Sequence, residues 1–326
     1  MRLGVLIAFA LGCGSTGAVP DGGPSSDLAT DNDAFTADAF EPDAPDAFVC
    51  ECAPFEGCVA GSCACDGDPL CGTAGFATFP MVAPVERTLS ARDGVVDDAL
   101  TGLSWERAMD GVSRTHAEAR ERCEALALDG HDDWRLPARV ELATILDATR
   151  TPTLDAAVFG AAIEDYVWTA SVAATGESRA FAIYFGQGET ILATAELAGA
   201  HVRCVRGERE PAAARRIEGD WLVDEGAGLE WSVAIEAAST LAEAQLACEP
   251  RGARLPTLYE LHALVDEGRV APATDRRLDE ASAPVWSTTE RDFGEVLAWV
   301  MDFEEGTSDL RAVDQAIAAR CVRAIP

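Results

Sequence analysis

The stretch R-L-P-A-R-V-E-L occupies residues 135–142, and R-L-P-T-L-Y-E-L occupies residues 254–261. The same short motifs surround both stretches in the same order. A motif G-L-x-W precedes each stretch and R-C-V-R follows it, at 102–105 and 203–206 in the first copy and at 228–231 and 320–323 in the second. Repetition at a nearly fixed interval predicts two domains of one fold. We place these domains at 87–207 and 217–325.

Each copy predicts a first helix that carries a buried cysteine. The pattern T-x-x-E at 115–118 and at 240–243 is a capping box, in which the Thr and Glu side chains satisfy free amides at a helix start. Cys123 and Cys248 stand eight residues after the two Thr residues. Cys123 shares the helical spacing of nearby apolar residues, so we expect it on the buried face.

The rest of each copy predicts a second helix and a small antiparallel sheet. Pro137 and Pro256 suit a helix start, where a missing N–H is not needed. Alternating apolar residues with period two indicate strands with one buried face. They are Phe181, Ile183 and Phe185 in the first copy and Trp299, Met301 and Phe303 in the second. The predicted fold class is therefore α+β, with two helices and a small sheet in each domain.

One cysteine in the first helix and one in the last strand predict a disulfide within each domain. The pairs are Cys123–Cys204 and Cys248–Cys321. In the chain-entropy model, closing loops this long stabilises a fold by roughly 4–5 kcal/mol. The alternative is two free thiols per domain.

The first 49 residues predict export and a spacer. Residues 1–13 combine Arg2, a short apolar stretch and A-L-G-C, which resembles the lipobox of bacterial lipoproteins. We expect Cys13 to carry lipid, while an ordinary secretory signal is the alternative. Residues 14–49 are rich in Asp, Ala, Pro and Ser, a composition typical of an extended, disordered linker.

Residues 50–71 predict a small disulfide-rich module. Its six cysteines are Cys50, Cys52, Cys58, Cys63, Cys65 and Cys71. A piece this short has no room for a core, so disulfides take its place, and the sequence does not choose among fifteen pairings. Zinc is the competing ligand, but C-x-C spacing without a nearby His suits it poorly.

The charge excludes some partners. The net charge is −31, and none of the 25 basic residues is Lys. Residues 86–326 alone hold 44 acidic residues and 24 Arg. Nucleic acids and other polyanions need a positive surface, so we expect no nucleic-acid partner.

The ordered motifs resemble the C-terminal domain of the Legionella collagen-like adhesin. In the first copy the matching residues are Asp98, Thr101, Gly102, Leu103, Trp105, Cys123, Asp133, Trp134, Arg135, Leu136, Pro137, Glu141, Leu142, Trp168, Thr169, Ser171 and 203–206. The second copy departs from the pattern at Ala227, Gly252 and Ala253. A looser likeness to C-type-lectin-like domains implies two such domains in tandem. The calcium-binding motifs of lectins have no equivalent here, since T-A-S follows Trp168 and S-T-T follows Trp286.

Catalytic motifs are absent from the sequence, so we predict no enzyme, cofactor or metal. The four histidines do not recur at matching positions of the two copies, which favours structural roles. They are His116, His131, His201 and His262.

The candidate ligand-facing residues flank the Trp strand, because binding residues commonly lie on loops of a rigid scaffold. They are Asp165, Tyr166, Glu177, Arg179, Thr288, Glu290, Arg291 and Asp292. Together these features predict a lipoprotein of the outer membrane or cell surface. It would touch the membrane through the lipid of Cys13 only and display two adhesion domains to an extracellular protein or glycan. The alternatives are a structural envelope protein and an enzyme of unknown type.

Overall fold

The computed structural model describes residues 57–59, 62–64, 81, 88–160, 164–174, 179–195, 199–208, 215–278 and 283–325. The predicted export signal 1–13 and linker 14–49 lie outside these residues. In the module 50–71 the structure describes the backbone of a hairpin, β1 (Gly57–Val59) and β2 (Ser62–Ala64). The side chains of its six cysteines lie outside the description, so their pairing stays a prediction, as does lipidation of Cys13.

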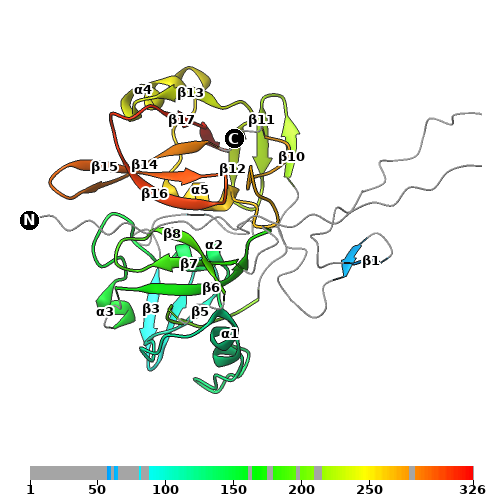
Figure 1. Ribbon diagram of the computed structural model, residues 1–326, viewed down its shortest axis with the longest axis vertical. Helices are drawn as coiled ribbons and strands as arrows, with labels where there is room; N and C mark the ends of the chain where they lie inside the picture. Colours follow the sequence, from blue (N-terminus) through cyan, green and yellow to red (C-terminus); the bar gives the residue numbers. More distant parts are fainter. Residues whose placement is uncertain are drawn as a thin grey trace, which may run out of the picture. The chain divides into compact units, whose positions relative to one another are not determined.

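The first repeat, cyan to green in Figure 1, contains two antiparallel sheets. One sheet has the order β3 (Leu89–Arg92), β4 (Val95–Asp98), β5 (Ser104–Glu106) and β9 (Val205–Arg206). The other has the order β6 (Tyr166–Val172), β7 (Arg179–Tyr184) and β8 (Thr190–Thr194). The helices are α1 (His116–Glu124), α2 (Arg139–Ala143) and α3 (Ala156–Phe159).

The second repeat, yellow-green to red, has the same plan. Its first sheet is β10 (Arg215–Glu218), β11 (Trp221–Asp224), β12 (Leu229–Ser232) and β18 (Val322–Ala324). The second is β13 (Glu236–Ser239), β17 (Ile317–Ala319), β14 (Pro284–Asp292), β15 (Val296–Asp302) and β16 (Thr307–Ala312), with β14 and β17 parallel. The helices are α4 (Leu241–Cys248), a 3₁₀ turn (Glu249–Arg251) and α5 (Leu258–Leu264).

The central strands are buried on both faces, which corrects the expectation of one small sheet with one buried face. In β7, Ile183 joins an apolar cluster with Leu142 of α2. Its neighbour Ala182 points the other way, into a cluster with Cys123 and Trp168. An apolar cluster lies on each face of the strand, so alternation in the sequence marks two cores instead of a core and a surface.

The helix starts follow from local hydrogen bonds. Both predicted capping boxes on α1 and α4 are formed. Pro137 and Pro256, by contrast, lie two residues before their helices. The carboxylates of Glu141 and Glu260 accept the N–H groups of the residues that follow the prolines, at 2.7 Å in both copies, and so fix the cap there.

The predicted disulfide of each domain is present. Cys123 pairs with Cys204 and Cys248 with Cys321, each with 5.5 Å between the Cα atoms. All four cysteines are buried. Each bridge ties the first helix to the segment that enters the last strand, 81 and 73 residues further along the chain.

Candidate functional site

The shared R-L-P-x-x-x-E motif is a helix cap locked by an ion pair. Arg135 donates two hydrogen bonds to Glu141, at 2.8 and 2.7 Å, while Glu141 caps α2. Arg254 and Glu260 repeat the arrangement at 2.8 and 2.6 Å. Both carboxylates are buried. The motif therefore has a structural role in both repeats.

The R-C-V-R motif has a role that the sequence reasoning missed. Its first arginine points inward and donates to two successive backbone carbonyls, Glu106 and Arg107 for Arg203 at 2.5 and 2.8 Å. Arg320 does the same in the second repeat. Burial lowers the pKa of Arg203 to about 10, against the opposing charge of Glu106. Two arginines on either side of Cys-Val in one strand could have signalled that one of them faces the core.

Two of the candidate ligand-facing residues lie instead between the repeats. Arg291 is 3% exposed and donates to the carbonyl of Arg150 at 2.8 Å, to the carbonyl of Gln187 and to the hydroxyl of Thr151. Arg179 forms an ion pair with Glu305 of the second repeat at 2.5 Å. Both arginines therefore take part in the contact between the repeats, and a ligand-facing role for them stays a prediction.

The other candidates do not converge on one site. In the first repeat Asp165 lies 3.4 Å from His201, and the rings of Tyr166 and Tyr184 lie 5.1 Å apart at a 45° tilt. In the second repeat Thr288 donates to the carbonyl of Pro256, while Glu290 and Asp292 are exposed on the β14–β15 hairpin. Glu177 lies outside the described residues.

The two repeats meet through their equivalent helices α2 and α5. Arg139 of α2 is fully buried and donates to Nδ1 and the carbonyl oxygen of His262, at 2.6 and 2.9 Å, and to Glu267 at 3.1 Å. The hydroxyl of Tyr259 on α5 donates to the carbonyl of Leu146 at 2.9 Å. Burial, then the charge of Arg139, holds the pKa of His262 well below its usual range, so His262 is the neutral acceptor.

The contact between the repeats is close to a two-fold arrangement. Thr190 of β8 and Ser308 of β16 occupy equivalent positions, opposite Ile183 and Met301 of the neighbouring strands. These two residues bond each other, with 3.0 Å from the Thr190 nitrogen to the Ser308 hydroxyl. A residue that touches its own counterpart lies near the symmetry axis.

A small cavity lies between residues of the two repeats. A cavity lined by Leu146, Leu258, Tyr259 and His262, among others, has room for roughly one water molecule. A ligand larger than a water molecule would have to displace these side chains to enter this cavity.

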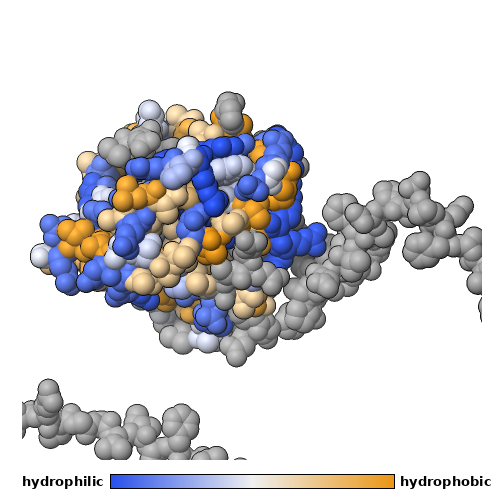
Figure 2. Space-filling model, turned by 90° about the horizontal axis from the view of Figure 1, so that it is seen from above, coloured by the Kyte–Doolittle hydropathy of each residue, from blue (hydrophilic) through white to orange (hydrophobic). Residues whose placement is uncertain are grey.

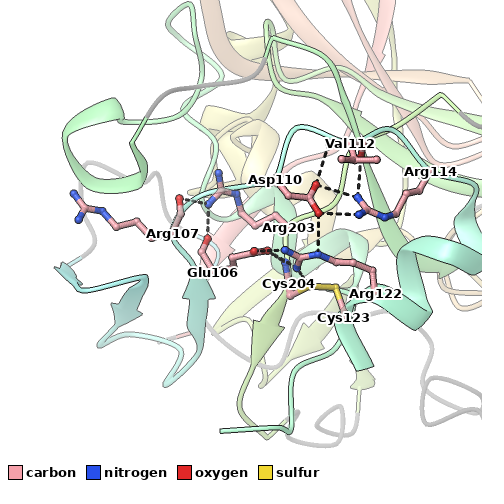
Figure 3. Close-up of polar contacts among 9 residues, drawn as sticks. All are labelled: Glu106, Arg107, Asp110, Val112, Arg114, Arg122, Cys123, Arg203 and Cys204. Atoms are coloured by element: carbon pink, nitrogen blue, oxygen red, sulfur yellow. Dashed lines mark hydrogen bonds and ion pairs between the residues drawn. A yellow bond between two sulfur atoms is a disulfide. The ribbon is translucent and has the colours of Figure 1, made fainter. Parts of the chain in front are cut away.

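A surface loop held by charged hydrogen bonds distinguishes the first repeat (Figure 3). In loop 107–114, Asp110 accepts two hydrogen bonds from Arg114, at 3.0 and 2.8 Å, and one from the backbone of Val112. Arg122 of α1 approaches Asp110 from the other side at 3.4 Å and donates to Glu106 at 2.7 Å. Partial burial would raise the pKa of Asp110, but these donors lower it to about 2.

The described residues of the second repeat form no such network. Ser232 stands at the position of Glu106, and Ala247 at that of Arg122. The hydroxyl of Ser232 takes over one contact, accepting the N–H of Cys321 at 3.0 Å. The charged loop clamp is therefore specific to the first repeat.

Two exposed apolar side-chain groups lie on loops that differ between the repeats. Val112 on loop 107–114 is 50% exposed. Phe293 and Val296, at the tip of the β14–β15 hairpin, are 50% and 46% exposed. Other large apolar side chains are also exposed, among them Leu246 at 62% and Val172 at 50%, and hydrophobic and hydrophilic groups are intermixed over the face in view in Figure 2. We regard loop 107–114 and the hairpin tip 290–296 as the candidate recognition loops.

The described residues offer neither a metal site nor a membrane-spanning helix. No group of His, Cys, Asp and Glu side chains in this part of the chain is arranged to hold a metal ion. No helix in it has the length and apolarity that crossing a bilayer requires.

Comparison with protein families gives one match. The family model of the Lcl C-terminal domain matches residues 94–206 and again residues 213–323. A comparison with curated proteins gave no match.

Proposed function

We propose that this chain, which belongs to the Lcl C-terminal domain family, is an exported envelope lipoprotein that binds an extracellular protein or neutral glycan through its two tandem domains. The family is associated with a collagen-like adhesin. The single observation that carries the proposal is that shared and unshared residues of the two copies lie in different parts of the structure. The motifs that both copies share are used inside the scaffold, while the exposed apolar side chains of loop 107–114 and of the hairpin tip 290–296 belong to one copy each.

Several features support display rather than catalysis. Each disulfide and ion-paired cap holds its domain rigid, which suits recognition by surface loops. The acidic linker 14–49 would hold the domains away from the membrane. We also propose that each domain is C-type-lectin-like, because a cysteine of the first helix is bridged to the segment that enters the last strand.

The recognition loops can be tested with matched substitutions. The full chain is bound to immobilised neutral glycans, to heparin and to fibronectin. We expect binding to a neutral glycan or to the protein, but not to heparin, whose charge repels a body with 44 acidic residues against 24 Arg in 86–326. Val112→Asp or Phe293→Asp should abolish it.

The control is Leu246→Asp, a substitution at an exposed leucine on α4, outside both loops. It should bind like the wild type. Equal binding by all three variants would refute the loops as the site. A wild-type chain that binds none of the probes would favour the structural alternative.

The anchor is tested separately. Mass spectrometry of the mature protein should show diacylglycerol on Cys13, and Cys13→Ser should release the protein from the membrane fraction. A mature chain that begins elsewhere and carries no lipid would refute lipid anchoring and leave the binding proposal intact.

A further inference from the structure

We propose that the two repeats are a matched pair: the contact face of each fits the other repeat and not a second copy of itself. The inference concerns pairing within the chain and does not depend on the proposed ligand. It rests on side chains at the contact that the two copies do not share, although the helices that carry them are equivalent.

A buried cation lies at the centre of the contact. Arg139 is fully buried and contributed by the first repeat, whereas its acceptor His262 and its counter-ion Glu267 come from the second. The side chain of Glu267 is itself only 11% exposed. A buried guanidinium is tolerated when it is paired and costly when it is not.

Exchange of either repeat would leave charge unpaired. Alignment of the copies on R-L-P-x-x-x-E places Leu258 at the position of Arg139, Ala143 at that of His262 and Ala148 at that of Glu267. A pair of two first repeats would set Arg139 against two alanines. A pair of two second repeats would set Glu267 against a leucine.

A second contact follows the same rule. Alignment on the Trp strands places Ala173 at the position of Arg291 and Leu297 at that of Arg179. The carbonyls that Arg291 reaches lie in the first repeat, and the Glu305 that pairs with Arg179 lies in the second. Arg179 therefore needs a carboxylate that lies in the second repeat, and Arg291 finds the Thr151 hydroxyl in the first repeat beside backbone carbonyls that either repeat would offer.

The contact should survive without the peptide link. A protease site placed in segment 209–214 of the full chain allows the link to be cut after folding. We expect the halves to co-elute in gel filtration at micromolar concentration, with both disulfides intact by mass spectrometry. When tagged first repeat is added during partial unfolding and refolding, it should be recovered with second repeats and not with other first repeats.

Substitutions identify the source of the specificity. Arg139→Leu introduces the residue of the second copy and should weaken association of the cut halves by roughly a hundredfold, from the unpaired Glu267 and lost bonds. Adding Glu267→Ala should recover part of that loss. The control Arg92→Leu removes an exposed ion-paired arginine of β3 and should change nothing.

Three outcomes overturn the proposal. They are wild-type halves that separate at micromolar concentration, first–first pairs that form as readily as mixed pairs, and Arg139→Leu halves that bind as tightly as Arg92→Leu halves. If Arg139→Leu fails to fold, Glu267→Gln tests the same ion pair with almost no change in shape and should weaken association at least tenfold.

Discussion

Asp266 is a carboxyl group whose surroundings favour the protonated form. Burial raises its pKa to about 6, although the N–H of Gly268 donates to it. Between roughly pH 4 and 6 the folded state therefore holds a proton that the unfolded state has released, and stability falls as the pH rises through this window. Asp266→Asn keeps the shape without the charge. We expect it to stabilise the protein by about 1–2 kcal/mol at pH 7 and not at pH 4, measured by urea unfolding.

The matched control is Asp292→Asn. Asp292 also accepts the N–H of the glycine two residues on, at 2.8 Å, but it is exposed at the hairpin tip. Its substitution should leave stability unchanged at both pH values. An equal gain from the two substitutions at pH 7 would show that burial of Asp266 is not the cause.

The turn between β15 and β16 of the second repeat requires a glycine. Gly306, between β15 and β16, has φ +78°, and a Cβ there would stand 2.6 Å from Cγ1 of Val265. Gly306→Ala should therefore cost about 2–3 kcal/mol of unfolding free energy, from the left-handed backbone and from overpacking. Gly294→Ala is the control, since Gly294 has φ +93° and open space around its Cβ. It should cost about 1 kcal/mol, and equal losses in thermal unfolding would contradict the packing argument.

At the scale of elements, the spacing of residues along the sequence predicted the features that short motifs build. The capping boxes and the disulfides depend on residues whose spacing repeats in both copies, and they are present. The sheet of β3, β4, β5 and β9, and its counterpart in the second repeat, could not be read in the same way, because β4 and β5 are short and β9 has two residues. Burial of both faces of β7 could not be predicted from its sequence either, because the second face is covered only by tertiary packing.

The contact between the repeats was beyond the sequence pattern for a different reason. Arg139 and Arg291 reach partners more than 100 residues away along the chain, and neither has an arginine at the equivalent position of the other copy. One local signal existed: Arg139 lies in a helix turn beside Val140 and Leu142, both buried. Differences between the copies at Arg139 and Arg291 thus mark the contact between the repeats.

At the scale of the whole molecule, each disulfide stabilises its own repeat, and each repeat stabilises the other through the contact between them. Replacement of both Cys248 and Cys321 by Ala should cost about 2–5 kcal/mol. Because the repeats share the buried contacts of Arg139 and Tyr259, we expect one transition in differential scanning calorimetry for the wild type and for this variant. Two separated transitions in the wild type would show that the repeats unfold independently.

Acid should loosen this pair through His262. Burial and the neighbouring Arg139 hold its pKa well below 6.5, so between these values the unfolded state binds a proton that the folded state does not. Stability contributed by neutral His262 is therefore present above pH 6.5 and is lost as the pH falls, by up to about 1.4 kcal/mol per pH unit.

His262→Gln keeps an acceptor for Arg139 and does not titrate. The fall in unfolding free energy from pH 7 to pH 5 should be smaller in His262→Gln than in the wild type, whereas His131→Gln, at an exposed histidine, should keep the wild-type slope. Because Asp266 titrates in the opposite sense over part of this range, the slope is read as the difference between variant and wild type. Parallel curves for His262→Gln and the wild type would mean that the contact does not depend on a neutral imidazole.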